Sequence, residues 1–222
     1  MNSAKMNQAA IRIILWSVAG LVGFYAAAWI GREVGALILF YWQMFLVVWV
    51  LFIVVITYLS RDPDPVEPSD INALVAPAHG TVDVIDEQTE SEFVNAPCQR
   101  VSIRISIMDV QVQYAPTAAR VNYSAHSRPI RLGGNSPLEM LLLGLEPILK
   151  PQEKLALRMV GSAWGRQIVP WVAAGDVPAR STRLGMMRLG TRVDIFLPHS
   201  AKLAVHVGDK LVGGQSVLAR WE

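Results

Sequence analysis

Residues 183–198, RLGMMRLGTRVDIFLP, contain the pattern that bears most directly on the fold. The residues at 184–187 predict one short strand. Apolar and polar residues alternate at 193–197 and predict a second strand, which ends at a proline. Gly190 and Thr191 lie between the two, and a glycine followed by a hydroxyl residue predicts a tight turn. The stretch therefore indicates two short strands joined by a turn.

Composition and charge narrow the class of protein. The chain has 222 residues, of which 52% are hydrophobic, and its mean hydropathy of +0.34 indicates membrane segments. A net charge of +2 is too small to favour nucleic acid as a partner. Cys98 is the single cysteine, which excludes an intrachain disulfide, and the four histidines lack the spacing of a metal site. We therefore expect neither nucleic acid nor metal as a ligand.

Two long uncharged runs occupy the first quarter of the chain, at residues 13–30 and 34–60. Each is long enough to cross a hydrocarbon core, which needs about 20 residues. Only Gly31-Arg32-Glu33 separates them, so we expect a transmembrane hairpin over residues 1–60, with helices at about 10–30 and 35–59. A single spanning helix with a re-entrant second segment is the alternative. The runs are too long for a cleaved signal peptide.

The basic residues beside these runs bear on orientation. Lys5, Arg12 and Arg61 lie on one side of the hairpin and Arg32 on the other. The excess of positive charge favours both termini, and hence the soluble domain, on the cytoplasmic side. The alternative is a domain that faces the periplasm.

After the membrane runs, residues 61–72 (RDPDPVEPSDIN) predict an extended, proline-rich linker. Residues 73–222 then show short β-branched runs between turns, which predict an all-β sandwich or barrel. The expected strands lie at 81–85, 100–107, 110–114, 155–160, 167–171, 193–197, 203–207 and 217–221. Residues 138–149 predict one short helix, capped by Ser136.

Several short motifs follow one another in the chain: Arg61-Asp62-Pro63, VAPAHG at 75–80, ISIMDVQVQYAP at 105–116, VGSAWGRQIV at 160–169, Gly175-Asp176 and RLGTRVD at 188–194. In this order they resemble the motifs of the short, bacterial and archaeal type of phosphatidylserine decarboxylase, over nearly the whole chain. Residues 205–219 also resemble the hairpin of biotinyl- or lipoyl-type hybrid barrels. The resemblance implies an all-β, barrel-sandwich-hybrid-like domain that follows a two-helix membrane hairpin.

The resemblance also implies a self-processing chemistry. In that family the precursor breaks between a glycine and a serine, and the serine becomes a pyruvoyl group that forms an imine with the amine of phosphatidylserine. Gly190 and Thr191 occupy the matching positions. Self-processing here would therefore leave a 2-oxoacyl group derived from Thr191, a 2-oxobutanoyl cap, as the cofactor.

Four family positions carry other residues in this chain. The family's Asp is His79, its His is Gln111, an Arg is Tyr114 and the Ser is Thr191. Gln111 has no titratable proton near neutral pH. His79 is either a turn histidine or a base that has taken over the missing role. These replacements favour a divergent, degenerate enzyme without a cofactor.

Three functions stay open. The favoured one is a membrane-anchored pseudoenzyme that binds lipid or a partner membrane protein, with Arg166 and Arg192 as candidates for the lipid phosphate. The second is an active phosphatidylserine decarboxylase that makes phosphatidylethanolamine, with Thr191 as the cleavage nucleophile. The third is a β-barrel adaptor or accessory subunit of a membrane complex. We expect a bacterial inner-membrane location and membrane phospholipid as a partner, and a homo-oligomer stays open.

Overall fold

A computed structural model of the chain describes residues 3–30, 36–59, 64–106, 108–127, 138–161, 168–187 and 192–222. It divides into two compact units, Met1–Arg61 and Asp62–Glu222. The first unit is helical, and the described part of the second is built from strands.

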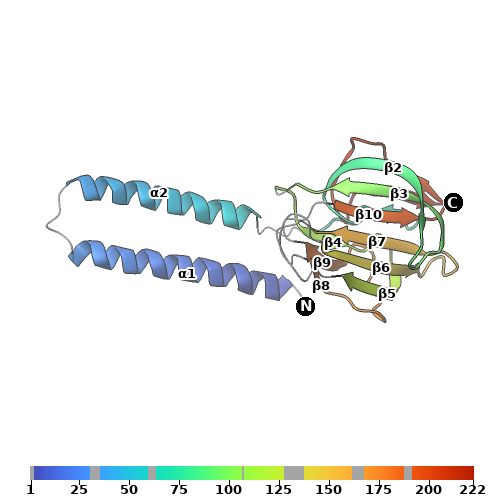
Figure 1. Ribbon diagram of the computed structural model, residues 1–222, viewed down its shortest axis with the longest axis horizontal. Helices are drawn as coiled ribbons and strands as arrows, with labels where there is room; N and C mark the ends of the chain where they lie inside the picture. The colour runs from blue at the N-terminus through green and yellow to red at the C-terminus, as the bar shows by residue number, and fades with distance from the viewer. Residues whose placement is uncertain are drawn as a thin grey trace. The chain divides into compact units, whose positions relative to one another are not determined.

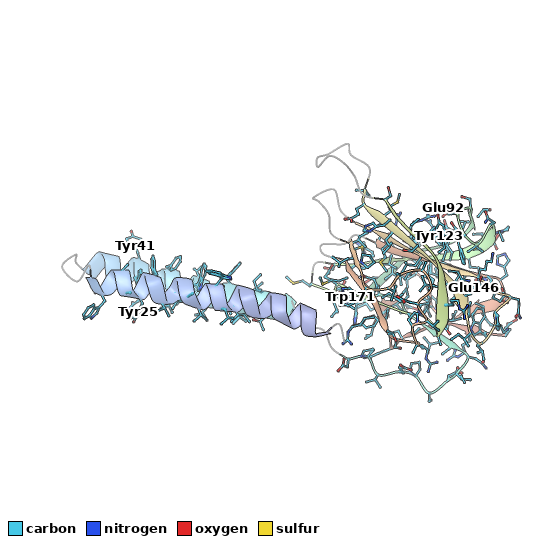
Figure 2. All side chains as sticks on the ribbon, turned by 90° about the horizontal axis from the view of Figure 1, so that it is seen from below. Tyr25, Tyr41, Glu92, Tyr123, Glu146 and Trp171 are labelled. Carbon is cyan, nitrogen blue, oxygen red and sulfur yellow. The ribbon has the colours of Figure 1, made fainter. Side chains whose placement is uncertain are left out.

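The helical unit consists of α1 (Ser3–Ile30) and α2 (Ala36–Leu59), which run antiparallel to one another (Figure 1). Aromatic rings join the two helices. The ring of Phe24 stacks on that of Trp42 with centroids 3.4 Å apart, and it lies 4.9 Å from the ring of Phe45. Tyr25 and Tyr41 lie near the same end of the pair (Figure 2). Such rings favour the water interface of a bilayer.

The two predicted helices are present, and α1 begins seven residues earlier than expected. In the described part of the chain, one segment is long and apolar enough to cross a membrane: Leu39–Tyr58 in α2, with a mean hydropathy of 2.5. The apolar segment of α1, Ile14–Ala27, is shorter. A hairpin in which both helices cross the membrane therefore stays a prediction.

The second unit contains the following strands: β1 (Ala73–Val75), β2 (Gly80–Glu90), β3 (Ala96–Arg104), β4 (Val112–Tyr114), β5 (Ala119–Ser127), β6 (Met140–Pro147), β7 (Leu155–Val160), β8 (Ile168–Pro170), β9 (Arg183–Met187), β10 (Arg192–Leu197), β11 (Ala201–Leu203), β12 (Lys210–Leu211) and β13 (Val217–Trp221). They form a seven-stranded sheet in the order β12-β2-β3-β10-β7-β6-β5 and two three-stranded sheets, β1-β13-β11 and β4-β9-β8. All neighbouring strands pair antiparallel. In Figure 1, β3, β10, β7 and β6 lie side by side.

The core lies on one face of the seven-stranded sheet and follows the period of two expected of strands. Its central layer is made of fully buried side chains from four neighbouring strands: Val101 and Ile103 of β3, Val193, Ile195 and Leu197 of β10, Leu155, Leu157 and Met159 of β7, and Leu141, Leu143 and Leu145 of β6. The predicted strands at 155–160 and 217–221 coincide with β7 and β13, and the one at 193–197 lies within β10.

The predicted helix at 138–149 is wrong, because most of this segment is the strand β6. Its run of leucines favours a helix by propensity. Packing on both faces of the strand decides otherwise: alternate leucines enter the core, while Leu142 is buried on the opposite face with Phe196. Gly144 leaves room for a ring, since a Cβ there would lie 2.5 Å from Phe93.

The predicted strand at 203–207 is also misplaced. Strand β11 ends at Leu203, and the chain then turns, with the Asp209 amide donating to the His206 carbonyl at 3.2 Å and Gly208 at φ +97°. Within 205–219, β12 pairs with β2 whereas β13 pairs with β1 and β11, so the two strands of this stretch belong to different sheets. The hybrid-barrel topology stays a prediction.

A buried carboxylate organises the outer face of the seven-stranded sheet. Glu90 accepts hydrogen bonds from the amides of Glu92, Phe93 and Val94 at 2.7–2.9 Å, and its side chain is fully buried. The turn that it holds lays Phe93 against Tyr123, with ring centroids 6.0 Å apart (Figure 2 labels Tyr123). Burial raises the pKa of the Glu90 carboxyl, but the three amides and the charge of Arg158 together outweigh burial, so the pKa lies below its ordinary value.

The described part of the proline-rich segment, residues 64–72, contains no helix or strand and is hydrogen-bonded to the rest of the β unit. Arg180 donates to the carbonyl oxygens of Pro68 and Asp70 at 2.7 and 2.6 Å. Arg183 bonds the Asp64 carboxylate at 2.6 Å, and Arg220 bonds that of Asp70 at 3.1 Å. These bonds fix residues 64–72, the described part of the predicted linker, to the β unit. We call this segment the strap.

The change Glu90→Gln should destabilise the protein at neutral pH by on the order of 2 kcal/mol, because charge-assisted bonds to three amides are weakened. Since the folded pKa is depressed, the advantage of wild type over the variant should be full above the ordinary Glu pKa of about 4.3 and should be lost as the pH falls through the lowered value. Thermal unfolding of the detergent-solubilised chain at a series of pH values measures this. Glu92→Gln, an exposed neighbour, is the control. Equal melting temperatures of wild type and Glu90→Gln at pH 7 would contradict the assignment.

The change Arg180→Gln should loosen the strap by removing charge-assisted hydrogen bonds that total roughly 2–3 kcal/mol. A protease that cuts on the amino side of aspartate should then cut between Ser69 and Asp70 faster than in wild type. Arg220→Gln is the graded comparison, because its exposed pair with Asp70 contributes less than about 1 kcal/mol. Identical cleavage rates in wild type and Arg180→Gln would show that Arg180 does not hold the strap.

Candidate functional site

One end of the seven-stranded sheet gathers most of the segments that carry the predicted site residues. We call it the Arg192 end. Here β10 begins at Arg192, which lies opposite Arg104 at the end of β3 and opposite Val160 at the end of β7. The neighbouring strands also end or begin here: β2 begins at Gly80, β6 begins at Met140 and β5 ends at Ser127. Strand register thus fixes where these strand ends lie, and with them the segments that carry the predicted site residues.

His79 reaches the Arg192 end because it directly precedes Gly80. A Cβ at Gly80 would collide with the carbonyl oxygen of Arg104, so only glycine lets β2 start this close to the end of β3. The His79 ring lies edge-on to that of Tyr114, with centroids 5.9 Å apart at 63°. Two of the replaced family positions therefore contact one another.

Tyr114 is fully buried beneath a turn of two glycines. A Cβ at Gly213 would lie 2.9 Å from the Tyr114 ring and 3.0 Å from that of His79. Gly214 has φ +73°, and its carbonyl accepts the Ser181 hydroxyl at 2.7 Å. The turn thus covers both rings, and the residue that replaces the family's Arg is a neutral packing residue.

Gln111 braces the chain just before β4. Its Nε2 donates to the carbonyl oxygens of Ser106 and Asp109, both at 2.9 Å. Its own backbone carbonyl accepts the amide of Met187, the last residue of β9, at 2.9 Å. The residue that replaces the family's His therefore lies beside the segment that leads to Gly190 and Thr191, but its side chain is occupied with backbone and carries no ionisable proton.

Arg192 is positioned by a buried acid. Its Nε lies 3.1 Å from Oδ1 of Asp194, which is fully buried and accepts the Ser102 hydroxyl at 2.7 Å. The second carboxylate oxygen of Asp194 has no hydrogen-bond partner among the described residues. The Arg192 side chain is 45% exposed. It is held at its inner nitrogen, while much of the side chain reaches solvent.

The structure reveals one ionisable pair that sequence reasoning missed. Nε2 of His126 lies 2.8 Å from Oε1 of Glu139, and Glu139 Oε2 accepts the amide of Ile168 at 3.2 Å. Glu139 is 1% exposed. The pair lies at the Arg192 end because His126 pairs with Leu141 and Glu139 directly precedes β6. The two are thirteen positions apart, so no local motif marks them.

The remaining predicted site residues, Gly190, Thr191 and Arg166, lie outside the described residues. Among the residues that are described, no three His, Cys, Asp or Glu side chains gather in a way that could hold a metal ion. The functional groups described at the Arg192 end are thus the Gln111 amide, the packed rings of His79 and Tyr114, two arginines with the buried Asp194 carboxylate, and the acid–imidazole pair.

Comparison with known proteins agrees with the motifs. A sequence model of the family described as Phosphatidylserine decarboxylase matches residues 52–219. The phosphatidylserine decarboxylase proenzyme of Desulfotalea psychrophila is 31% identical over 172 residues, covering 73% of this chain and 78% of that protein. The proenzyme of Erythrobacter litoralis is 32% identical over 184 residues (72% and 70%), and that of Porphyromonas gingivalis is 29% identical over 191 (84% and 86%). No solved structure matches the chain. The family resemblance is confirmed: the chain belongs to the phosphatidylserine decarboxylase family.

Proposed function

We propose that this family member is a membrane-anchored pseudoenzyme that binds phospholipid through its β unit and has lost both self-cleavage and decarboxylation. An accessory role beside another membrane protein is compatible with such binding. The single observation that carries the proposal is the role of Gln111, whose amide holds two backbone carbonyls where the family resemblance implies a histidine.

Gln111 cannot transfer the protons that the family reaction requires. The family reaction needs a base to activate the hydroxyl and an acid to protonate the carbanion left by CO2. A carboxamide does neither near neutral pH. Loss of one general acid or base typically lowers a rate by about 10²–10⁴-fold. His79 lies against a buried tyrosine and under the glycine turn, an environment that supports a packing role for it.

The helical unit supports membrane anchoring. Leu39–Tyr58 of α2 has the length and hydropathy of a membrane span. Its large side chains are exposed within the unit, including Tyr41 at 70%, Leu39 at 63% and Phe40 at 59%. Exposed apolar surface of this extent is stable in lipid and unfavourable in water.

A second candidate is an active, self-processing phosphatidylserine decarboxylase that makes phosphatidylethanolamine. The His126–Glu139 pair favours it, because an acid–imidazole pair at the Arg192 end offers the titratable groups that Gln111 lacks. In this route the Thr191 hydroxyl would attack the carbonyl carbon of Gly190 and convert the amide into an ester. β-Elimination would then release residues 1–190 as a carboxylate and leave a 2-oxobutanoyl cap, with loss of ammonia after hydrolysis.

The intact mass of the purified protein separates the two candidates. We expect a single species near the 24.4 kDa of the whole chain. Processing between Gly190 and Thr191 would instead release the 32 residues 191–222 with a blocked amino terminus. Two fragments that disappear in Thr191→Ala would refute the pseudoenzyme and favour the second candidate.

A variant that combines His79→Asp, Gln111→His and Thr191→Ser tests whether these replacements account for the loss of self-cleavage. Partial cleavage in this variant, but not in the same variant with Thr191→Ala in place of Thr191→Ser, is the expected result. If wild type alone already cleaves, His126→Gln tests the acid–imidazole pair and should slow cleavage by at least about tenfold.

A further inference from the structure

We propose that Arg104 and Arg192 together form a site for the phosphodiester of a phospholipid headgroup. The inference rests on the proposed lipid-binding function and assigns its headgroup contact. Neither the family match nor the relatives' names specify such a pair.

The first observation is register. Arg104 and Arg192 are direct partners on the neighbouring strands β3 and β10, so their side chains leave the sheet on the same face. Like charges placed directly opposite one another on paired strands are destabilising. An anion between the two guanidinium groups would convert this repulsion into attraction.

The second observation is that each arginine has guanidinium nitrogens that can donate hydrogen bonds to a ligand. Arg192 is held through Nε by the buried Asp194, and among the described residues its two terminal nitrogens stay available for a ligand. Arg104 is 68% exposed, and its Nε lies 3.7 Å from the nearest described carboxylate oxygen, on Asp83, beyond hydrogen-bond distance. Guanidinium groups bind phosphate oxygens in a planar, bidentate manner, so two of them suit a phosphodiester.

The buried carboxylate of Asp194 indicates why Arg192 is held in place. A buried carboxylate with one oxygen unpaired, among the described residues, is unfavourable for folding. Its Oδ1 is anchored by Ser102 and aligned with Arg192. We infer that Asp194 positions Arg192 for its ligand. By contrast, Arg100, the next basic residue inward on β3, is already paired bidentately with Asp86 at 2.8 and 2.7 Å.

Apolar side chains at the Arg192 end favour a lipid over free phosphate. Met140 is 40% exposed at the start of β6, and Leu138 is 39% exposed two residues earlier. Met108, four residues beyond Arg104, is 62% exposed. Arginines beside exposed apolar side chains match the junction between a headgroup and its acyl chains. We therefore assign a membrane phospholipid as the occupant.

Lipid titration of the full chain in neutral detergent, followed by native mass spectrometry, tests the assignment. The probes are phosphatidylserine, phosphatidylcholine, diacylglycerol and inorganic phosphate. Wild type should bind both phospholipids and bind diacylglycerol far more weakly, because only the phospholipids carry the phosphodiester. Arg104→Gln and Arg192→Gln should each raise the Kd for phosphatidylserine about tenfold or more.

Arg120→Gln is the matched control, since Arg120 is an exposed arginine at the opposite end of the sheet, where it pairs with Glu146. It should bind lipid as wild type does. Thermal unfolding separates binding from folding. Arg104→Gln removes the like charge opposite Arg192 and only a solvent-exposed 3.7 Å ion pair with Asp83, so it should not lower the melting temperature. Arg192→Lys keeps the charge without the fork and should retain part of the affinity.

Each outcome has a distinct meaning. Unchanged phospholipid affinity in both Arg→Gln variants would overturn the arginine site while leaving lipid binding intact. Binding of inorganic phosphate without phospholipid would overturn the lipid assignment. A wild-type chain that binds no phospholipid would overturn the proposed lipid-binding function together with the inference.

Discussion

The pairing of β10 with β3 on one side and β7 on the other is the constraint on which the β unit depends. Residues 192–196 have backbone partners on both strands. On one face of this strand, Val193, Ile195 and Leu197 enter the core, and on the other Asp194 and Phe196 are also buried. Because β10 begins directly after Thr191, the same ladder that builds the core fixes the residue that follows the position where the family breaks its chain.

Burial on both faces explains why the sheet carries a second layer. Phe196 lies beneath the guanidinium of Arg158, with the Cζ atom 4.8 Å from the ring centroid. The turn held by Glu90 folds over the same face, where Phe93 occupies the space that Gly144 leaves. The outer face of the sheet thus carries a small apolar cluster, which is covered by the turn that Glu90 holds and by charged side chains such as Arg158. At the Arg192 end of this face, Arg104 and Arg192 are exposed to solvent.

The replaced family positions share a physical character. Gln111 and Tyr114 have structural roles, one bracing backbone carbonyls and the other filling space beneath two glycines. Residues in such roles stabilise the fold without supplying protons. In the proposed function, the geometry of a family fold is kept while its ionisable groups are exchanged for packing and hydrogen bonding, and the exposed arginines supply binding.

The sequence by itself determined the family, the two helices and the strands β7, β10 and β13. Hydrophobic runs and alternating patterns are local, and the motifs near Gly80 and Gly190 are contiguous in the chain. Only the tertiary structure decided that residues 140–147 are a strand, because its leucines are buried on both faces by residues distant in sequence, such as Phe196. It also decided that His126 meets Glu139 and that Arg104 opposes Arg192. These contacts join residues 13 and 88 positions apart, and strand register, which depends on the assembled core, brings them together.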